Sequence, residues 1–243
     1  MGQFLRSFHV FRKPPRVALE GLVCEVYIQA GVAASIIEYT EKKRRELSKP
    51  RAGRSVVFVY SPPGDWTSFY PNPEFSDQQI EELAATGKLT GISLYVYDSD
   101  NWGFSLFDRG ATCFVWNRDV DEPISVSKKE VAELHDLFLQ LFNKTIDRQK
   151  IKHLFETDAP RSEEKLYSLS DELGIEGGGI GREDILEGTQ TDLDYSLVKA
   201  TEVSPAAVTM RPPSSGGSRP PRRSAGSCCS ASRRPPSPSP RTP

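Results

Sequence analysis

The sequence is poor in the residues on which most enzyme active sites depend. Its 243 residues include only three histidines and four cysteines. It holds no Cys-x-x-Cys pair or cysteine/histidine spacing typical of a zinc site, and no G-x-S-x-G motif marks a nucleophilic serine. The glycine-rich stretch 177–181 is followed by Arg182 and Glu183, not by the lysine and hydroxyl residue of a phosphate-binding loop. We therefore expect no cofactor and no metal, and catalysis is the less favoured interpretation.

Long apolar stretches are also absent. The apolar runs are short, such as Val-Val-Phe-Val-Tyr at 56–60, whereas a membrane-spanning helix needs about 20 apolar residues. The first residues lack the apolar segment of a secretion signal. Cys24 and Cys113 lie in apolar segments, and Cys228 and Cys229 are adjacent, which is not a pattern typical of disulfides. The expectation is a cytoplasmic protein with no membrane partner.

Negative charge is unevenly distributed along the chain. The formal net charge is −2, but residues 204–243 hold seven arginines and no acidic residue, which leaves −2 − 7 = −9 for residues 1–203. The same forty residues hold ten prolines and ten serines, a composition typical of disordered chain. The sequence thus predicts an acidic body followed by a basic tail.

Hydrophobic periodicity and capping motifs predict the elements of the body. Helical spacing predicts a helix at 16–30, and capping boxes beginning at Ser76 and Ser127 predict two more. The proline-rich segment 61–75 is predicted to be a loop, and the charged stretch 41–46 a strand end and a loop. Strands are predicted in six apolar or β-branched segments: 4–11, 32–41, 54–60, 91–97, 102–107 and 111–116.

The order of these elements predicts the fold class. To residue 97 the order is β-α-β-β-α-β, the ferredoxin-like arrangement, and a hairpin and a helix follow it. We predict an α+β fold with a mainly antiparallel sheet and helices packed on it. The expected parts are a core domain at 1–145, a small helical appendage at 146–203 and a disordered Pro/Ser/Arg-rich tail at 204–243.

Aromatic residues near predicted loops are the first candidate binding residues. Trp66, Phe69 and Tyr70 lie on the proline-stiffened loop, and Trp102 lies beside a turn. Tryptophan and tyrosine anchor interfaces because they bury a large area with little loss of rotamer freedom. The alternative is that these rings fold back and cover an open end of the core.

A pair of acidic residues is the second candidate. Asp98 and Asp100 form a D-x-D sequence, and two carboxylates on one turn are suited to a hard cation such as Ca²⁺ or Mg²⁺. The EF-hand pattern is absent, because Trp102 and Arg109 stand where it requires ligands. The alternative is a hairpin turn stabilised by its aspartate side chains.

Three hypotheses of function follow. The favoured one is a non-catalytic cytoplasmic protein-binding module with a basic protein partner, for example an immunity-type protein that neutralises a toxin. The second is a carboxylate- or metal-dependent enzyme with its site near the 98–102 turn. The third is a protein that binds nucleic acid through its basic tail, and it is disfavoured because the tail has no aromatic residues for base stacking.

Overall fold

The protein folds around a single large antiparallel sheet. The structure, a computed structural model, describes residues 5–12, 16–48, 56–71, 75–97, 101–117, 127–156, 162–178, 182–187 and 195–201. In these ranges eight strands form a sheet of order β2-β8-β3-β4-β1-β5-β6-β7, and all neighbouring pairs are antiparallel. The strands are β1 (Leu5–Phe11), β2 (Ala33–Glu38), β3 (Val56–Tyr60), β4 (Trp66–Tyr70), β5 (Gly91–Tyr97), β6 (Asn101–Asp108), β7 (Ala111–Asn117) and β8 (Tyr195–Thr201). The predicted α+β class with a mainly antiparallel sheet is confirmed.

Seven helices accompany the sheet within the described ranges. They are α1 (Arg16–Gln29), α2 (Glu41–Leu47), α3 (Asp77–Gly87), α4 (Lys128–Phe142), α5 (Arg148–Glu156), α6 (Ser162–Leu173) and α7 (Arg182–Glu187). Both predicted capping boxes are present, because the Ser76 and Ser127 side chains accept from the third residue of α3 and α4. None of these helices is long and apolar enough to cross a bilayer.

The first strand holds the middle of the sheet. β1 pairs with β4 on one side and with β5 on the other, so it joins the two halves of the sheet. β4 and β5 are connected through α3 and flank β1, which makes a split β-α-β unit. The finer prediction of a ferredoxin-like order is not confirmed, because α2 and β4 add to the predicted succession of elements.

Strand β4 corrects the prediction that the whole segment 61–75 is a loop. The prolines of this segment, at 62, 63, 71 and 73, lie outside the paired residues Trp66–Tyr70. The five residues between them are aromatic, β-branched or small, and they pair in register with β1 and β3. Proline thus delimits the strand here, since it is tolerated beyond the paired residues but not within them.

Helix α2 is a second correction, because the charged stretch 41–46 forms neither a strand end nor a loop. Thr40 caps the helix, and its side chain accepts a hydrogen bond from the Lys43 amide at 3.2 Å. Only Leu47 of this helix is a buried apolar residue. A seven-residue helix with one apolar contact lacks the hydrophobic periodicity on which helix prediction depends.

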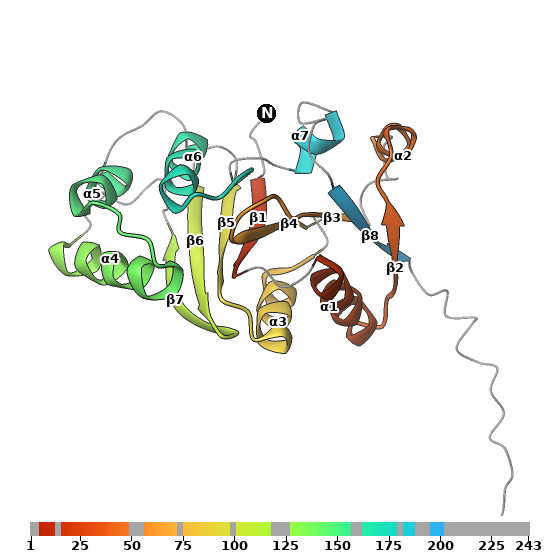
Figure 1. Ribbon diagram of the computed structural model, residues 1–243, viewed down its shortest axis with the longest axis horizontal. Coiled ribbons are helices and arrows are strands. Elements are labelled where there is room, and N and C mark those ends of the chain that lie inside the picture. Colours follow the sequence, from red (N-terminus) through yellow and green to blue (C-terminus); the bar gives the residue numbers. More distant parts are fainter. Residues whose placement is uncertain are drawn as a thin grey trace, which may run out of the picture. The chain divides into compact units, whose positions relative to one another are not determined.

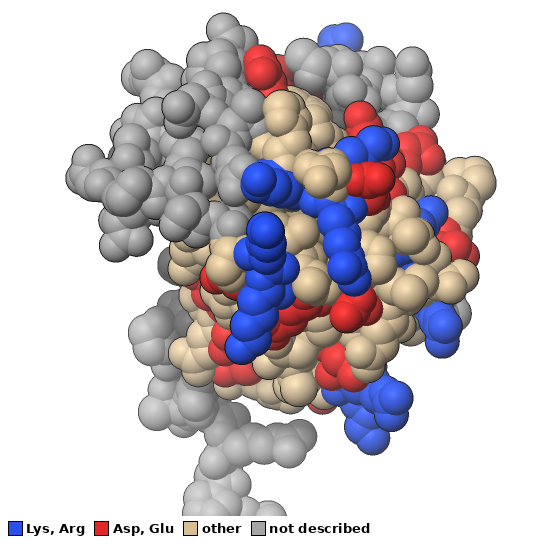
Figure 2. Space-filling view, turned by 90° about the vertical axis from the view of Figure 1, so that its left-hand side faces the viewer, with Lys and Arg blue, Asp and Glu red and all other residues tan. Residues whose placement is uncertain are grey.

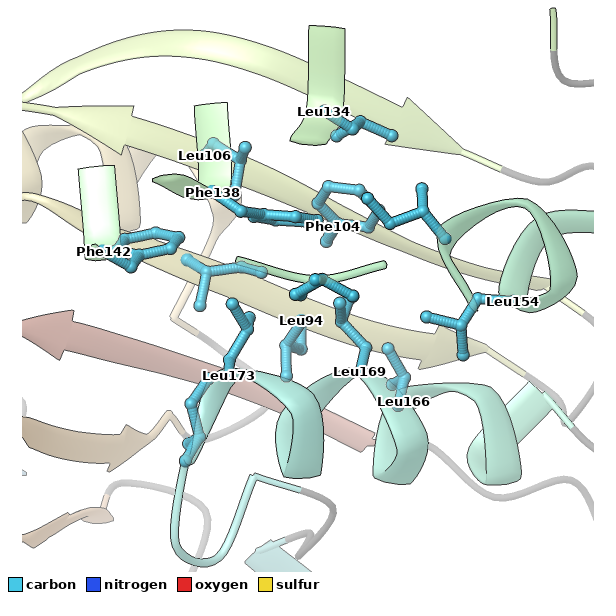
Figure 3. Close-up of a cluster of buried hydrophobic side chains, with 14 of the residues drawn as sticks. Leu94, Phe104, Leu106, Leu134, Phe138, Phe142, Leu154, Leu166, Leu169 and Leu173 are labelled. Atoms are coloured by element: carbon cyan, nitrogen blue, oxygen red, sulfur yellow. The ribbon is translucent and has the colours of Figure 1, made fainter. Parts of the chain in front are cut away.

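The two faces of the sheet are covered by different helices. α1 and α3 lie side by side over one face (Figure 1), where their apolar residues pack on β1, β3, β4 and β8. On the other face, α4, α5 and α6 cover β5 and β6 through a leucine- and phenylalanine-rich cluster. Figure 3 shows Phe104 of β6 among side chains such as Phe138 of α4 and Leu169 of α6. A third cluster joins α2 and α7 to β3 and β8.

Residues beyond 145 contribute both to the core and to the sheet. Ile146 belongs to the buried cluster under α4–α6, to which α5 and α6 also contribute. β8 lies between β2 and β3, inside the sheet. The predicted appendage at 146–203 therefore holds an inner strand that the sequence analysis missed, while its helices α5 and α6 pack on the body. The predicted tail at 204–243 lies outside the described residues.

Strand β1 provides a test of this architecture. Phe8 is fully buried, and its ring meets those of Phe69 and Phe107 edge-on at centroid distances of 5.7 and 5.4 Å. We expect Phe8→Ala to lower the free energy of unfolding by about 3–5 kcal/mol, as measured by urea denaturation. Phe8→Leu should lose less. The control Ile28→Ala, at an exposed position of α1, should change it by less than about 0.5 kcal/mol.

Candidate functional site

The structure buries all four aromatic residues that were predicted to form a binding surface. Trp66, Phe69 and Tyr70 are at most 3% exposed in β4, and Trp102 is fully buried in β6. Trp66 Nε1 donates to the Leu173 carbonyl at 3.2 Å, and Trp102 stacks on an aromatic ring of α5. This is the alternative arrangement, in which the rings complete the core. The prediction that these four rings offer an exposed surface is therefore wrong.

The acidic pair lies outside the described residues. Asp98 and Asp100 belong to the connection between β5 and β6, whose ends Tyr97 and Asn101 pair with each other. Within the part of the chain that the structure describes, no group of three or more His, Cys, Asp and Glu side chains could hold a metal ion.

One cluster of catalytic residue types was missed by the sequence analysis. Ser7 and His9 on β1 face Ser68 and Tyr70 on β4, and we call these four residues the polar seam. Ser7 Oγ lies 2.8 Å from His9 Nε2, and Ser68 Oγ lies 2.7 Å from His9 Nδ1. The pattern S-x-H on one strand and S-x-Y on another was visible in the sequence. Its convergence depends on the pairing of β1 with β4.

The burial of the polar seam argues for a structural role. His9 is fully buried, and burial lowers the pKa of its imidazole to about 3. The neutral ring donates from one nitrogen and accepts at the other, so both its hydrogen bonds are satisfied by serine hydroxyl groups. A nucleophilic site needs a serine that a substrate reaches, and both serines are fully buried here.

A tyrosine layer continues the polar seam beneath the residues that follow α6. Tyr60 donates to Glu176 Oε1 at 2.7 Å, and Tyr70 donates to the Gly177 carbonyl at 2.9 Å. Burial raises the pKa of Tyr70, and the nearby Tyr195 hydroxyl raises it further. Both bonds attach the chain after α6 to the sheet. Gly177, the first residue of the glycine-rich stretch, therefore lies against a buried tyrosine hydroxyl group.

An open groove lies on the face of the sheet that α1 and α3 leave uncovered at β5–β7. Its volume is about 460 Å³. Its floor is built from residues of three strands: Ser93, Tyr95, Tyr97, Asn101, Ser105, Phe107, Val115 and Asn117. One wall is formed by the first turns of α3, with Asp77, Ile80 and Glu81. We call this feature the tyrosine groove.

The floor of the tyrosine groove depends on a glycine. Tyr95, Gly103 and Asn117 occupy one row across β5, β6 and β7. The Tyr95 ring lies over Gly103, where a Cβ atom would come within 2.5 Å of both the ring and the Trp116 carbonyl oxygen. The Tyr95 hydroxyl donates to Asn117 Oδ1. Burial, with Tyr97 and Asp77 nearby, raises the pKa of Tyr95 to about 12, so this hydroxyl remains a donor.

The wall of the tyrosine groove is acidic. Asp77 and Glu81 stand one turn apart on α3, and neither lysine nor arginine is found among the described residues that line the groove. Arg6 of β1 forms an ion pair with Asp77 and donates to the Phe75 carbonyl. This pair holds the N-terminal end of α3 against the sheet, which fixes the direction of the wall.

A second hollow, of about 610 Å³, lies between α5 and α6 and has mixed charge. Lys150 lies 2.6 Å from Glu172 across it, and Arg148 lies 3.8 Å from Asp136 nearby. Figure 2 shows the side of the molecule to the left of Figure 1, where basic and acidic side chains alternate. Among the described residues on this side, basic side chains therefore form no continuous surface of the kind that follows a nucleic-acid backbone.

Comparisons with known proteins found no match, either to a protein-family model or to a curated protein or a solved structure.

The buried histidine predicts a specific pH dependence of stability. Its pKa is lower in the folded protein, about 3, than in the unfolded chain, about 6.5. The unfolded state therefore binds a proton first, and stability is lost as the pH falls from about 6.5 towards 3, by about 1.4 kcal/mol per pH unit. We expect His9→Gln to remove this slope between pH 6 and 4 in urea denaturation. His153→Gln, on α5, should keep it, and parallel curves for His9→Gln and the parent would contradict the assignment.

The glycine beneath Tyr95 predicts a pair of opposite effects. Gly103→Ala should lower the free energy of unfolding by roughly 1–3 kcal/mol, because the added methyl group displaces the ring or the neighbouring strand. Gly21→Ala, in α1, meets no atom within 4 Å and should raise it by about 0.5–1 kcal/mol. Urea denaturation of both variants measures this. A neutral Gly103→Ala would mean that the ring does not lie across the glycine.

Proposed function

We propose that this protein is a non-catalytic protein-binding module and that the tyrosine groove holds a cationic segment of its partner. The observation that carries the proposal is the composition of the groove. It combines two tyrosine rings with the exposed carboxylate of Glu81 and with Asp77, which Arg6 already pairs, and has no basic residue among its described lining. Aromatic rings beside carboxylates suit lysine and arginine side chains, which bind both.

The tyrosine pair supports a protein partner. The Tyr95 and Tyr97 rings lie 5.2 Å apart between centroids, and Tyr97 is 38% exposed. Such rings offer apolar area and a polar edge at low entropic cost, which is why tyrosine is frequent at protein interfaces. Tyr95 is held in place by Asn117 and by the row of paired strands, so binding does not have to order it.

The charge of the body supports a basic partner. Residues 1–203 carry a net charge of −9, from −2 for the chain minus the seven arginines beyond them. An acidic surface attracts a cationic protein over a distance and speeds its association. The concrete version that we propose is an immunity-type protein that neutralises a basic toxin. The free thiols of Cys24 and Cys113 support a reducing cytoplasm as its location.

A direct binding experiment tests the proposed function. The probe is a fluorescent synthetic peptide of alternating lysine and valine, titrated with the full chain at low salt. We expect Tyr97→Ala and Glu81→Gln each to weaken binding by about two- to fivefold, as expected for one cation–π contact or one ion pair near the surface. Fluorescence anisotropy provides the dissociation constants.

Matched variants on the opposite face of the sheet serve as controls. Tyr167 of α6 is exposed like Tyr97, and Glu133 of α4 is exposed like Glu81. Tyr167→Ala and Glu133→Gln should leave binding unchanged, and a peptide with glutamate in place of lysine should not bind. Equal losses for Glu81→Gln and Glu133→Gln, with both tyrosine variants binding like the parent, would show that only the overall charge of the body attracts the peptide, which contradicts a role for the groove.

A further inference from the structure

The tyrosine groove extends to β7, which forms one edge of the sheet. Within the described residues β7 pairs with β6 alone, and it stands last in the strand order (Figure 1). Its seven residues, Ala-Thr-Cys-Phe-Val-Trp-Asn, include no charged residue and no proline. Natural proteins usually protect an edge strand with such residues, because its unpaired amide and carbonyl groups accept another strand.

The other edge of the sheet differs in this respect. β2 ends at Glu38, and the charged helix α2 follows it after two residues. On β7 the exposed side chains are uncharged, and Val115 is 54% exposed. The two edges are therefore not equivalent, and β7 offers the more favourable place for strand addition.

One half of β7 has the regular geometry that strand addition requires. The register with β6 shifts between Leu106 and Phe107, so that Leu106 pairs with Phe114 and Phe107 pairs with Thr112. The extra residue, Cys113, is a bulge that twists the first half of the strand. The residues after it, Phe114–Asn117, pair without interruption with Gly103–Leu106.

The regular half of β7 is also the half that borders the groove. Val115 and Asn117 line the groove floor, while Phe114 and Trp116 pack on the cluster beneath α4–α6. Side chains of an added strand would alternate in the same way. One set would extend the groove beyond Val115 and Asn117, and the other would continue the apolar face beside Trp116.

We propose that the cationic partner segment binds in an extended conformation as a ninth strand on Phe114–Asn117 of β7. Its lysine or arginine side chains on the groove side then lie beside Val115 and Asn117, at the end of the groove that the Tyr95 hydroxyl reaches. This inference rests on the proposed function, to which it adds the conformation of the bound segment and the strand that receives it.

Charge selects this occupant over a second copy of the chain. Pairing β7 with its own copy brings together two chains of net charge −2, in each of which residues 1–203 carry −9 and the offsetting +7 lies beyond them. β7 has no charged residue that offsets this repulsion. A cationic segment has the opposite sign to the body and so gains from the same charge.

The experiment compares the alternating lysine–valine peptide with a version that carries N-methyl groups on its four central amides. N-methylation removes the backbone donors and keeps the charge and the side chains. We expect the methylated peptide to bind the full chain at least about tenfold more weakly, from the loss of two or more backbone hydrogen bonds. A peptide with the same number of N-methyl groups at its two ends should bind like the unmodified one.

Hydrogen exchange locates the bound peptide. With the unmodified peptide bound, the amides of Phe114–Asn117 should exchange more slowly, whereas the exchange of the β2 amides should not change.

The outcomes distinguish the two proposals. If the centrally methylated peptide binds with equal affinity, and Tyr97→Ala and Glu81→Gln still weaken binding, strand addition is overturned but the proposed function remains intact. Both strand addition and the proposed function are overturned if the unmodified peptide does not bind, or if Tyr97→Ala and Glu81→Gln leave its affinity unchanged. A concentration-dependent dimer of the protein alone, which the peptide dissociates, assigns the edge to a second copy and overturns the choice of partner.

Discussion

The pairing of β1 with both β4 and β5 is the constraint on which the rest of the structure depends. Without this strand the sheet divides into a half with β2, β8, β3 and β4 and a half with β5, β6 and β7. Every side chain from Ser7 to Phe11 is buried, and each face of β1 serves a different core. The hydrogen bond between His9 and Ser68 then specifies the register with β4, because a shift of one residue would leave one imidazole nitrogen without a partner in the interior.

The tyrosine groove is a consequence of how helices are distributed over this sheet. β5, β6 and β7 are covered by α4–α6 on one face, while α3 reaches their other face only at its edge, near Phe107. The uncovered face must meet water, and its residues are mainly tyrosine, serine and asparagine, with the exposed Val115 and the buried Phe107. Such a surface is stable in solution and still retains apolar area for a partner, which distinguishes it from the fully apolar clusters elsewhere.

Local signals in the sequence were sufficient to predict the helices that begin with a capping box. The capping boxes at Ser76 and Ser127 each place two reciprocal hydrogen bonds within four residues, so the start of α3 and of α4 was predictable without tertiary information. The prolines around β4 predict a loop throughout 61–75, whereas in the structure they only delimit the strand. β8 was missed because its role as an inner strand depends on neighbours more than a hundred residues away in sequence, β2 and β3.

The candidate site was less predictable than the fold, for a related reason. Aromatic residues near prolines suggested exposure, but the paired conformation of β4 turned Trp66 and Tyr70 into the core. The rings that remain accessible belong to Tyr95 and Tyr97, in a segment whose sequence predicts a strand but no binding site. They become a surface because Gly103 leaves room for Tyr95 and because none of the helices in the described part of the chain covers the row that ends at Asn117. The acidic charge of the body was also only partly predictable. Composition shows that it exists, but only the position of α3 sets Asp77 and Glu81 beside the rings of Tyr95 and Tyr97.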